Sequence, residues 1–192
     1  MIEVKKGRSL INEVSQFVDI HFEAFEKEVS TALGRRYLIR LYKTMLKGKN
    51  SVVFYKRERQ NIIGFIIYTK GTPKLFQHIH FKELLNLFFR AIQAPSLIFK
   101  LLSQVFMSTK KNHYNYFEIS FYAVRKDYQS NGIGKNLLNE LLNYSKESSI
   151  KNIITKTNNK DLLSFYLKNF TSEIFSTSSF FWFKYYLIKI KP

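Results

Sequence analysis

One junction constrains the fold of this chain more than any other segment: the sequence YQSNGIGKNLL at residues 128–138. It follows a run of aromatic and β-branched residues at 115–124, which is typical of a strand. It opens the amphipathic run 132–147, which predicts a helix. Gly132 and Gly134 lie in the turn between them. Such a turn leaves free backbone N–H groups at the positive end of the helix dipole, so the junction predicts an anion site, most often for phosphate.

The other segments predict a mixed fold without internal repeats. Strand patterns occur at 2–5, 51–57, 62–70, 151–157 and in two C-terminal runs within 170–190. Apolar residues at helical spacing predict helices at 9–29, from an N-cap at Thr31 onward, and at 161–169. Gly64 inside a strand predicts a bulge or a close backbone approach. The fold class is therefore α/β of the α+β kind, with a mostly antiparallel sheet and helices on both faces, as a single domain over 1–192.

A helical insert at about 74–111 stands apart from this pattern because it is both strongly apolar and basic. Pro95 predicts a break between two short helices. We consider three interpretations, in this order: extra core or a lid over an acceptor pocket, a dimer face, and a peripheral membrane contact through residues 81–107. The expected oligomeric state is a monomer or a homodimer.

Composition narrows the classes of function. The chain of 192 residues has no cysteine, which excludes disulfides, thiolate metal sites and a cysteine nucleophile. Its four histidines show no metal-ligand spacing, so we expect no metal. The formal charge of +17 favours an anionic partner, although abundant lysine also reflects general composition. The sequence shows neither a secretory signal nor an apolar run long enough to span a membrane, so we expect a cytoplasmic protein.

Two familiar phosphate-binding motifs do not fit the turn. The P-loop needs glycine where Gln129 stands and serine or threonine where Asn136 stands. The dinucleotide fingerprint needs glycine or alanine where Leu137 stands, and no acidic residue is well placed downstream. A third pattern fits at every fixed position: valine at Val124, four residues, glutamine, two residues, glycine, one residue, and glycine at Gly134. This segment resembles motif A of the GNAT superfamily of N-acetyltransferases, with Lys126 in place of the usual proline.

A second segment of the chain agrees with this resemblance. The family has asparagine, six residues and tyrosine, which match Asn159 and Tyr166. The following Lys168-Asn169-Phe170 is one residue shorter than the usual lysine, any residue, glycine, phenylalanine. A shifted register would select Asn158 and Phe165 and remove the tyrosine hydroxyl. The resemblance covers 115–185 well and 2–71 loosely. With HFEAF, TALGRRYL and the insert, the chain is similar to a bacterial subgroup of unknown acceptor.

The resemblance implies the GNAT fold, with a mixed, mostly antiparallel sheet of six to seven strands and the insert before the central strand. It also implies acetyl-CoA as co-substrate, with direct transfer of the acetyl group to a primary amine. Backbone amides of the turn would hold the CoA pyrophosphate, and the end of the strand would pair with the pantetheine arm. The residues implied in cofactor binding are Ala123, Val124, Gln129, Ser130, Asn131, Gly132, Ile133, Gly134, Lys135 and Asn159.

Two residues are candidates for the proton transfers that the resemblance implies. Glu118 is the candidate base, since alternation along the strand would place it on one face with Tyr122 and Val124. The alternative is a strand glutamate paired with a lysine. Tyr166 is the candidate acid for the leaving thiolate, and the alternative is a core tyrosine. The amide of Val124 is the candidate oxyanion donor.

The remaining residues have less specific assignments. Asn159 is expected to bind the pantetheine arm, to cap the following helix, or both. His21 and Glu23 fall in the helical region that borders the acceptor site in this family, but a packing role is expected for each. The expected acceptor is a small-molecule amine, with an amino sugar as one candidate. Two other functions remain open: a basic domain that binds nucleic acid, although no specific motif is present, and an inactive CoA-binding sensor.

Overall fold

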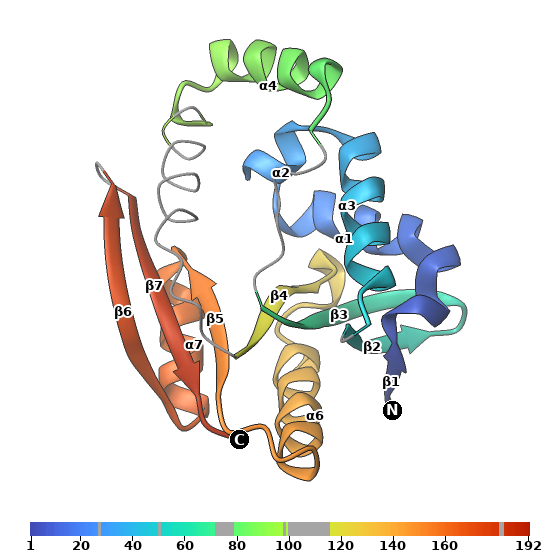
Figure 1. Ribbon diagram of the computed structural model, residues 1–192, viewed down its shortest axis with the longest axis vertical. Coiled ribbons are helices and arrows are strands. Elements are labelled where there is room, and N and C mark those ends of the chain that lie inside the picture. The colour runs from blue at the N-terminus through green and yellow to red at the C-terminus, as the bar shows by residue number, and fades with distance from the viewer. Residues whose placement is uncertain (27, 50, 72–78, 98, 100–115, 181–182) are drawn as a thin grey trace.

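The computed structural model describes residues 1–192 apart from 27, 50, 72–78, 98, 100–115 and 181–182. Its strands form one seven-stranded sheet in the order β1-β2-β3-β4-β5-β7-β6 (Figure 1). The strands are β1 Ile2–Lys6, β2 Val52–Glu58, β3 Asn61–Lys70, β4 Phe117–Val124, β5 Ile153–Thr157, β6 Ser172–Phe180 and β7 Phe183–Ile190. Only β4 and β5 pair in parallel. The predicted mixed, mostly antiparallel sheet is confirmed.

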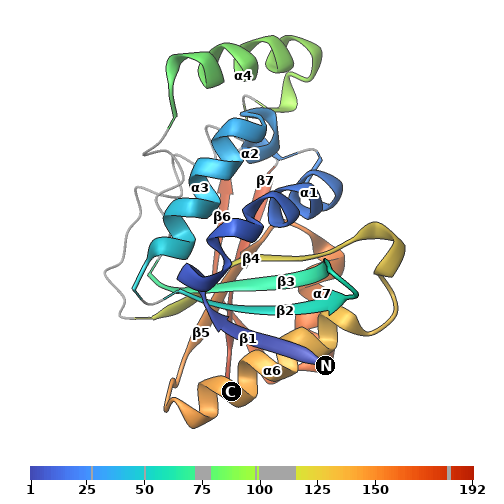
Figure 2. The same cartoon turned by 90° about the vertical axis from the view of Figure 1, so that its right-hand side faces the viewer.

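Helices cover both faces of the sheet, as predicted (Figures 1 and 2). On one face lie the 3-10 helix η1 Gly7–Glu13 and the helices α1 Val14–Ala24, α2 Val29–Ala32 and α3 Arg35–Lys47. On the other face lie α6 Ile133–Glu147 and α7 Lys160–Asn169. Each face has its own hydrophobic core, which we call the first core and the second core. The sheet is therefore buried on both sides over its central strands.

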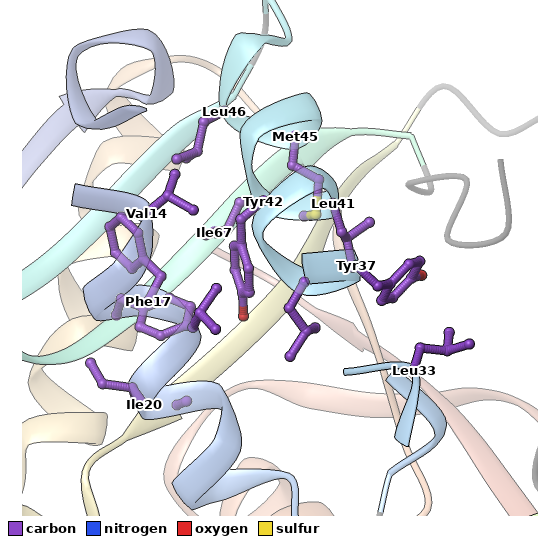
Figure 3. Close-up of a cluster of buried hydrophobic side chains, with 14 of the residues drawn as sticks. Val14, Phe17, Ile20, Leu33, Tyr37, Leu41, Tyr42, Met45, Leu46 and Ile67 are labelled. Carbon is purple, nitrogen blue, oxygen red and sulfur yellow. The ribbon is translucent and has the colours of Figure 1, made fainter. Parts of the chain in front are cut away.

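The first core is built from the amphipathic faces of α1 and α3 against β2, β3 and β4. Figure 3 shows Phe17 and Tyr42 facing one another between the two helices, with Ile67 of β3 beside them. The Phe17 and Tyr42 rings are stacked with centroids 6.2 Å apart. Both side chains are fully buried, which removes a large apolar area from water and fixes the helices on the sheet.

The N-terminal helical region differs from the prediction of one helix over 9–29. It is divided into η1, α1 and α2, because helix α1 ends at Ala24 and a new helix, α2, begins at Val29. Thr31 does not cap the next helix, since it lies within α2 and its hydroxyl donates to the Phe25 carbonyl at 2.6 Å. Instead α3 begins after Gly34, whose φ of 95° is in the left-handed region that glycine tolerates.

The hairpin of β2 and β3 turns at residues 59–60, as predicted, and carries a bulge beside Gly64. Lys56 pairs with Gly64 and Arg57 pairs with Ile62, which leaves Ile63 as the extra residue. Gly64 also allows a close approach, because a Cβ there would lie 3.1 Å from a methyl of Val124. The two alternatives predicted for Gly64 therefore both occur, one of them displaced by one residue.

The described part of the insert contains α4 Phe81–Gln93, which ends two residues before Pro95. The chain is helical again at Ser96 and Leu97. The predicted insert residues 74–78, 98 and 100–111 lie outside the described residues. In the described ranges, no helix is both long and apolar enough to cross a membrane.

Candidate acetyl-CoA and acyl-transfer site

The turn between β4 and α6 ends in an open helix terminus. A 3-10 helix, η3 Lys126–Tyr128, leads to Gly132, which is the N-cap of α6 with a φ of 72°. No side chain caps α6, and the first helical hydrogen bond runs from Asn136 N to Gly132 O at 3.0 Å. The amides at the start of α6 therefore have no partner within the helix, and residues 129–132 are exposed. This geometry suits an anion.

Three contacts fix the turn, one to the end of β4 and two to the β2–β3 hairpin. The Gln129 side-chain amide donates to the Val124 carbonyl at 2.9 Å, which closes the turn on the end of β4. The amide of Arg125 donates to the Ile63 carbonyl at 2.9 Å. The Tyr128 hydroxyl donates to the Glu58 carboxylate. The path of the turn is therefore fixed by side chains and backbone before any ligand binds.

The two glycines of the turn serve different purposes. Gly132 needs its positive φ, and nothing lies within 4 Å of the position of its missing Cβ. Gly134 makes room for Tyr122, because a Cβ at this position would lie 2.2 Å from the Tyr122 hydroxyl oxygen. The sequence placed both glycines in a turn that is expected to hold a phosphate. Packing against Tyr122 is a second reason for Gly134 that only the tertiary structure reveals.

The edge of β4 opens where β5 turns away from it. The two strands pair only at Phe117 with Ile153 and at Glu118 with Ile154, and then separate (Figure 1). Residues 119–124 of β4 therefore have no β5 neighbour in the register. An opening of this kind leaves backbone groups of a central strand available to an extended ligand.

The direction of the β4 backbone amides decides which residues of the strand face the opening. Because Arg125 N donates to Ile63 O, the neighbouring residue Val124 points its N–H away from β3, toward the open side. By the same alternation, Tyr122 points its backbone to the open side and Ala123 points toward β3. The Ala123 backbone is therefore engaged with β3. Tyr122, which the sequence pattern did not single out for this edge, and Val124 have backbone groups that face the opening.

A second bulge changes which β4 side chains share a face. Ile67 pairs with Phe121 and Tyr68 with Ile119, so Ser120 is the extra residue. Ile119 and Tyr122 both pack in the second core, although they are three residues apart. The prediction of one common face for Glu118, Tyr122 and Val124 is therefore wrong. Glu118 lies on the face of the first core, and no glycine or proline in the strand signals the bulge.

Glu118 is buried beside a lysine of the neighbouring strand. It is 5% exposed, and the Lys156 ammonium lies 3.9 Å from its carboxylate. The lysine pairing considered from the sequence is therefore present. The carboxylate lies where β4 and β5 separate, at the end of the opening. A buried carboxylate at such a position has the chemistry to accept a proton from an amine.

Tyr166 reaches β4 from the opposite face. It is fully buried in the second core, and its ring centroid lies 6.5 Å from that of Tyr122. Burial, and secondarily Tyr122, raises the pKa of the Tyr166 phenol, and a hydrogen bond with Thr155 acts in the opposite direction. The phenol is therefore protonated at neutral pH. Phe165, from the alternative register, packs against Phe170 with ring centroids 5.5 Å apart.

Asn159 caps α7. Its side-chain oxygen accepts hydrogen bonds from Asp161 N at 2.8 Å and from Leu162 N at 3.0 Å. The capping role considered from the sequence is thus present, and it fixes the start of the helix that carries Tyr166.

His21 has the surroundings of a packing residue. Its ring is fully buried, with Nδ1 2.9 Å from the Tyr42 hydroxyl and Nε2 3.0 Å from the Ser30 hydroxyl. Burial lowers the pKa of His21 to about 3. Glu23, the other residue considered near an acceptor, forms an ion pair with Arg125 at 3.1 Å. No group of three or more His, Cys, Asp or Glu side chains in the described part of the chain could hold a metal ion.

Most of the chain matches a known protein family, and its fold matches solved structures. The model of the acetyltransferase (GNAT) family matches residues 14–170. A search of curated protein sequences finds no match. Among solved structures, the ribosomal-protein-S18-alanine N-acetyltransferase from Escherichia coli matches with a TM-score of 0.62 at 10% identity, covering 100% of this chain and 94% of that chain.

Two further solved structures cover the whole chain. A mosquito arylalkylamine N-acetyltransferase like 5b matches with a TM-score of 0.61 at 14% identity, covering 100% of this chain and 99% of that chain. The PaiA N-acetyltransferase from Thermoplasma acidophilum, solved in complex with coenzyme A, matches with a TM-score of 0.57, the same identity and the same coverage. At these identities the likeness shows the fold.

Proposed function

The chain belongs to the GNAT family of acetyltransferases, and from this premise we propose that it moves an acetyl group from acetyl-CoA directly to a primary amine. The observation that carries the proposal is the uncapped start of α6, fixed in an exposed turn beside the open edge of β4. An anion-binding terminus next to an unpaired strand edge suits a ligand with a diphosphate at one end and an amide-bearing arm behind it.

Two parts of acetyl-CoA, the pyrophosphate and the pantetheine arm, have groups that would bind them. The pyrophosphate lies on the amides of Gly132, Ile133 and Gly134, with Ser130, Asn131 and Lys135 exposed beside it. The pantetheine arm runs along the open edge of β4 and pairs with Tyr122 and Val124. Gln129 holds the turn and the end of β4 together, because its side-chain amide donates to the Val124 carbonyl.

The reaction uses both faces of the sheet. Glu118, on the face of the first core, takes a proton from the amine, directly or through water. The amine nitrogen attacks the thioester carbonyl in the opening between β4 and β5, and the Val124 N–H stabilises the oxyanion. The carbon–sulfur bond then breaks, and Tyr166 protonates the thiolate from the face of the second core. Base and acid are thus separated by β4.

The acceptor is proposed to be a small amine, with amino sugars as the first class to screen. The described matches carry names that point to different amines, a protein alanine and arylalkylamines, so the fold leaves the acceptor open. The charge of +17 favours an acceptor with a negative group, such as a nucleotide-linked amino sugar.

Binding of the donor is tested by calorimetry on a matched pair of variants. Asn131→Asp places a negative charge at the turn, where it favours the helix dipole but repels a pyrophosphate. Asn143→Asp makes the same change on the exposed surface of α6, away from the turn. We expect acetyl-CoA to bind about tenfold or more weakly to the first variant and normally to the second. Equal binding to both, or no binding to the wild type, would reject the proposed donor site.

The two catalytic assignments are tested by kinetics with an amine that the wild type acetylates. Tyr166→Phe is expected to lower kcat by about a hundredfold without changing acetyl-CoA affinity. Glu118→Gln is expected to lower kcat most at low pH, where fewer amines are neutral. An unchanged kcat in either variant would remove that residue from the mechanism. Binding of acetyl-CoA without transfer to any amine in the screen would favour a CoA sensor.

A further inference from the structure

Helix α4 presents a broad apolar face to solvent. Six large apolar side chains, spaced for one side of a helix, are exposed by 40–73%: Phe81, Leu84, Leu85, Phe88, Phe89 and Ile92. Exposed single apolar residues are ordinary, but several large ones gathered on one helix face are typical of an interaction surface. We call these six side chains the α4 face.

The opposite side of α4 is firmly attached, so the orientation of the α4 face is fixed. Leu87 and Ala91 are buried, and Leu87 belongs to the first core. Glu83 pairs with Arg40 of α3 at 2.7 Å and accepts from His80 N at 2.9 Å. The hydrogen bond from Arg40 holds the pKa of Glu83 below its ordinary value. Figures 1 and 2 show α4 at the end of the molecule, beyond α2 and away from the sheet.

The exposed charged side chains of α4 are positive. Lys82 and Arg90 are the exposed charged residues of the helix, and its single acid, Glu83, is buried in the pair with Arg40. The whole chain carries a formal charge of +17. The α4 face therefore combines aromatic and aliphatic side chains with cations and has no exposed carboxylate on its own helix.

These charges favour an anionic bilayer over a second copy of the chain as the partner that covers the α4 face. A second copy would bring together two chains of the same large positive charge. An anionic bilayer attracts the cations, and the apolar side chains need only enter the headgroup boundary, about 5–10 Å deep.

We propose that α4 docks this protein on the surface of anionic lipid bilayers, with the α4 face in the interfacial region and Lys82, at the edge of that face, toward lipid headgroups. The helix lies in the plane of the surface and does not cross it. This proposal rests on the exposure and charge of α4 and is independent of the proposed acetyl transfer.

The experiment is flotation of the full chain with vesicles. One set of vesicles is phosphatidylcholine with about 30% phosphatidylglycerol, and the other is phosphatidylcholine alone. The test variant is Phe88→Ser with Phe89→Ser, and the control is Phe175→Ser, an apolar residue of β6 that is 45% exposed. We expect the wild type and the control to float with anionic vesicles, and the test variant to bind about tenfold or more weakly. Thermal unfolding should match the wild type, since the replaced side chains face solvent.

Three results would overturn the proposal. Equal flotation of the wild type and the test variant would mean that charge alone binds the vesicles. Absence of wild-type flotation with anionic vesicles would remove the bilayer as partner. Light scattering that finds a wild-type dimer and a monomeric test variant would assign the α4 face to a second copy.

Discussion

At the scale of single residues, Gly134 and Tyr122 act as a unit. The phenol occupies the space that a side chain at position 134 would fill, and it also approaches Tyr166. The start of α6, the open edge of β4 and the candidate acid are therefore connected through one side chain. A change at any of these positions is expected to affect the other two.

This connection predicts a non-additive pair of substitutions. Gly134→Ala places a Cβ 2.2 Å from the Tyr122 hydroxyl oxygen, which forces the ring to move. We expect a loss of about 1–3 kcal/mol in the free energy of unfolding, measured by chemical denaturation. Tyr122→Phe removes that oxygen and leaves the ring carbon at 3.2 Å as the nearest contact.

The double variant should therefore recover most of the loss, with a coupling energy of about 1 kcal/mol or more. If the effects of the two substitutions simply add, the phenol does not set the requirement for glycine. The acetyl-CoA affinity of the same variants shows whether the turn still binds the donor when Gly134→Ala adds a methyl group.

At the scale of elements, one carboxylate contributes to holding α4 on the rest of the molecule. Glu83 contacts the first turn of its own helix through His80 N and contacts α3 through Arg40. Leu87 and Ala91 are further buried side chains of this helix. Local opening of α4 is therefore expected to need less free energy than opening of the central strands.

Glu83→Gln tests this attachment. The amide keeps the shape but loses the charge that pairs with Arg40, so we expect amide hydrogen exchange in α4 to rise about tenfold. Exchange in β3 and β4 should not change. Glu147→Gln, an exposed position of α6, removes the same charge as a control. A uniform increase across the whole chain would show that α4 opens only with global unfolding.

At the scale of the whole molecule, stability depends on pH through a histidine inside the first core. His21 has a folded-state pKa of about 3 because burial disfavours its charged form. In the unfolded chain its pKa is near 6.5, so below that pH the unfolded state binds a proton that the folded state does not. The free energy of unfolding is therefore expected to fall as pH decreases from 6.5 toward 3.

The expected slope between pH 6.5 and 5 approaches about 1.4 kcal/mol per pH unit. His21→Gln should flatten this slope while lowering stability at pH 8, where the loss of packing acts alone. Chemical denaturation at several pH values measures both effects. A variant with the same slope as the wild type would assign the acid sensitivity to other groups.

Much of the fold could be predicted because its signals are local. The β-branched and aromatic runs of β2 and β3, the helical spacing in α6 and the break before Pro95 each depend on residues near one another in the sequence. The GNAT resemblance, carried by Val124, Gln129 and the two glycines, is confirmed by the family match. The division of the first helical region was missed. It involves a contact between α2 and the segment before it, the hydrogen bond from the Thr31 hydroxyl to the Phe25 carbonyl, and the apolar spacing of the sequence does not indicate such a contact.

The sequence by itself determined the order of elements, the strand–turn–helix junction and the family, because these depend on short-range pattern and backbone requirements. Only the tertiary structure decided the face of Glu118, the direction of the Ala123 backbone and the reason for Gly134. Each depends on a contact with another element. The pairing with β3 places the bulge at Ser120, the hydrogen bond from Arg125 to Ile63 sets the backbone direction, and the Tyr122 side chain occupies the space beside Gly134. The exposure of the α4 face was also decided there, since an apolar helix looks the same in sequence whether a core covers it or not.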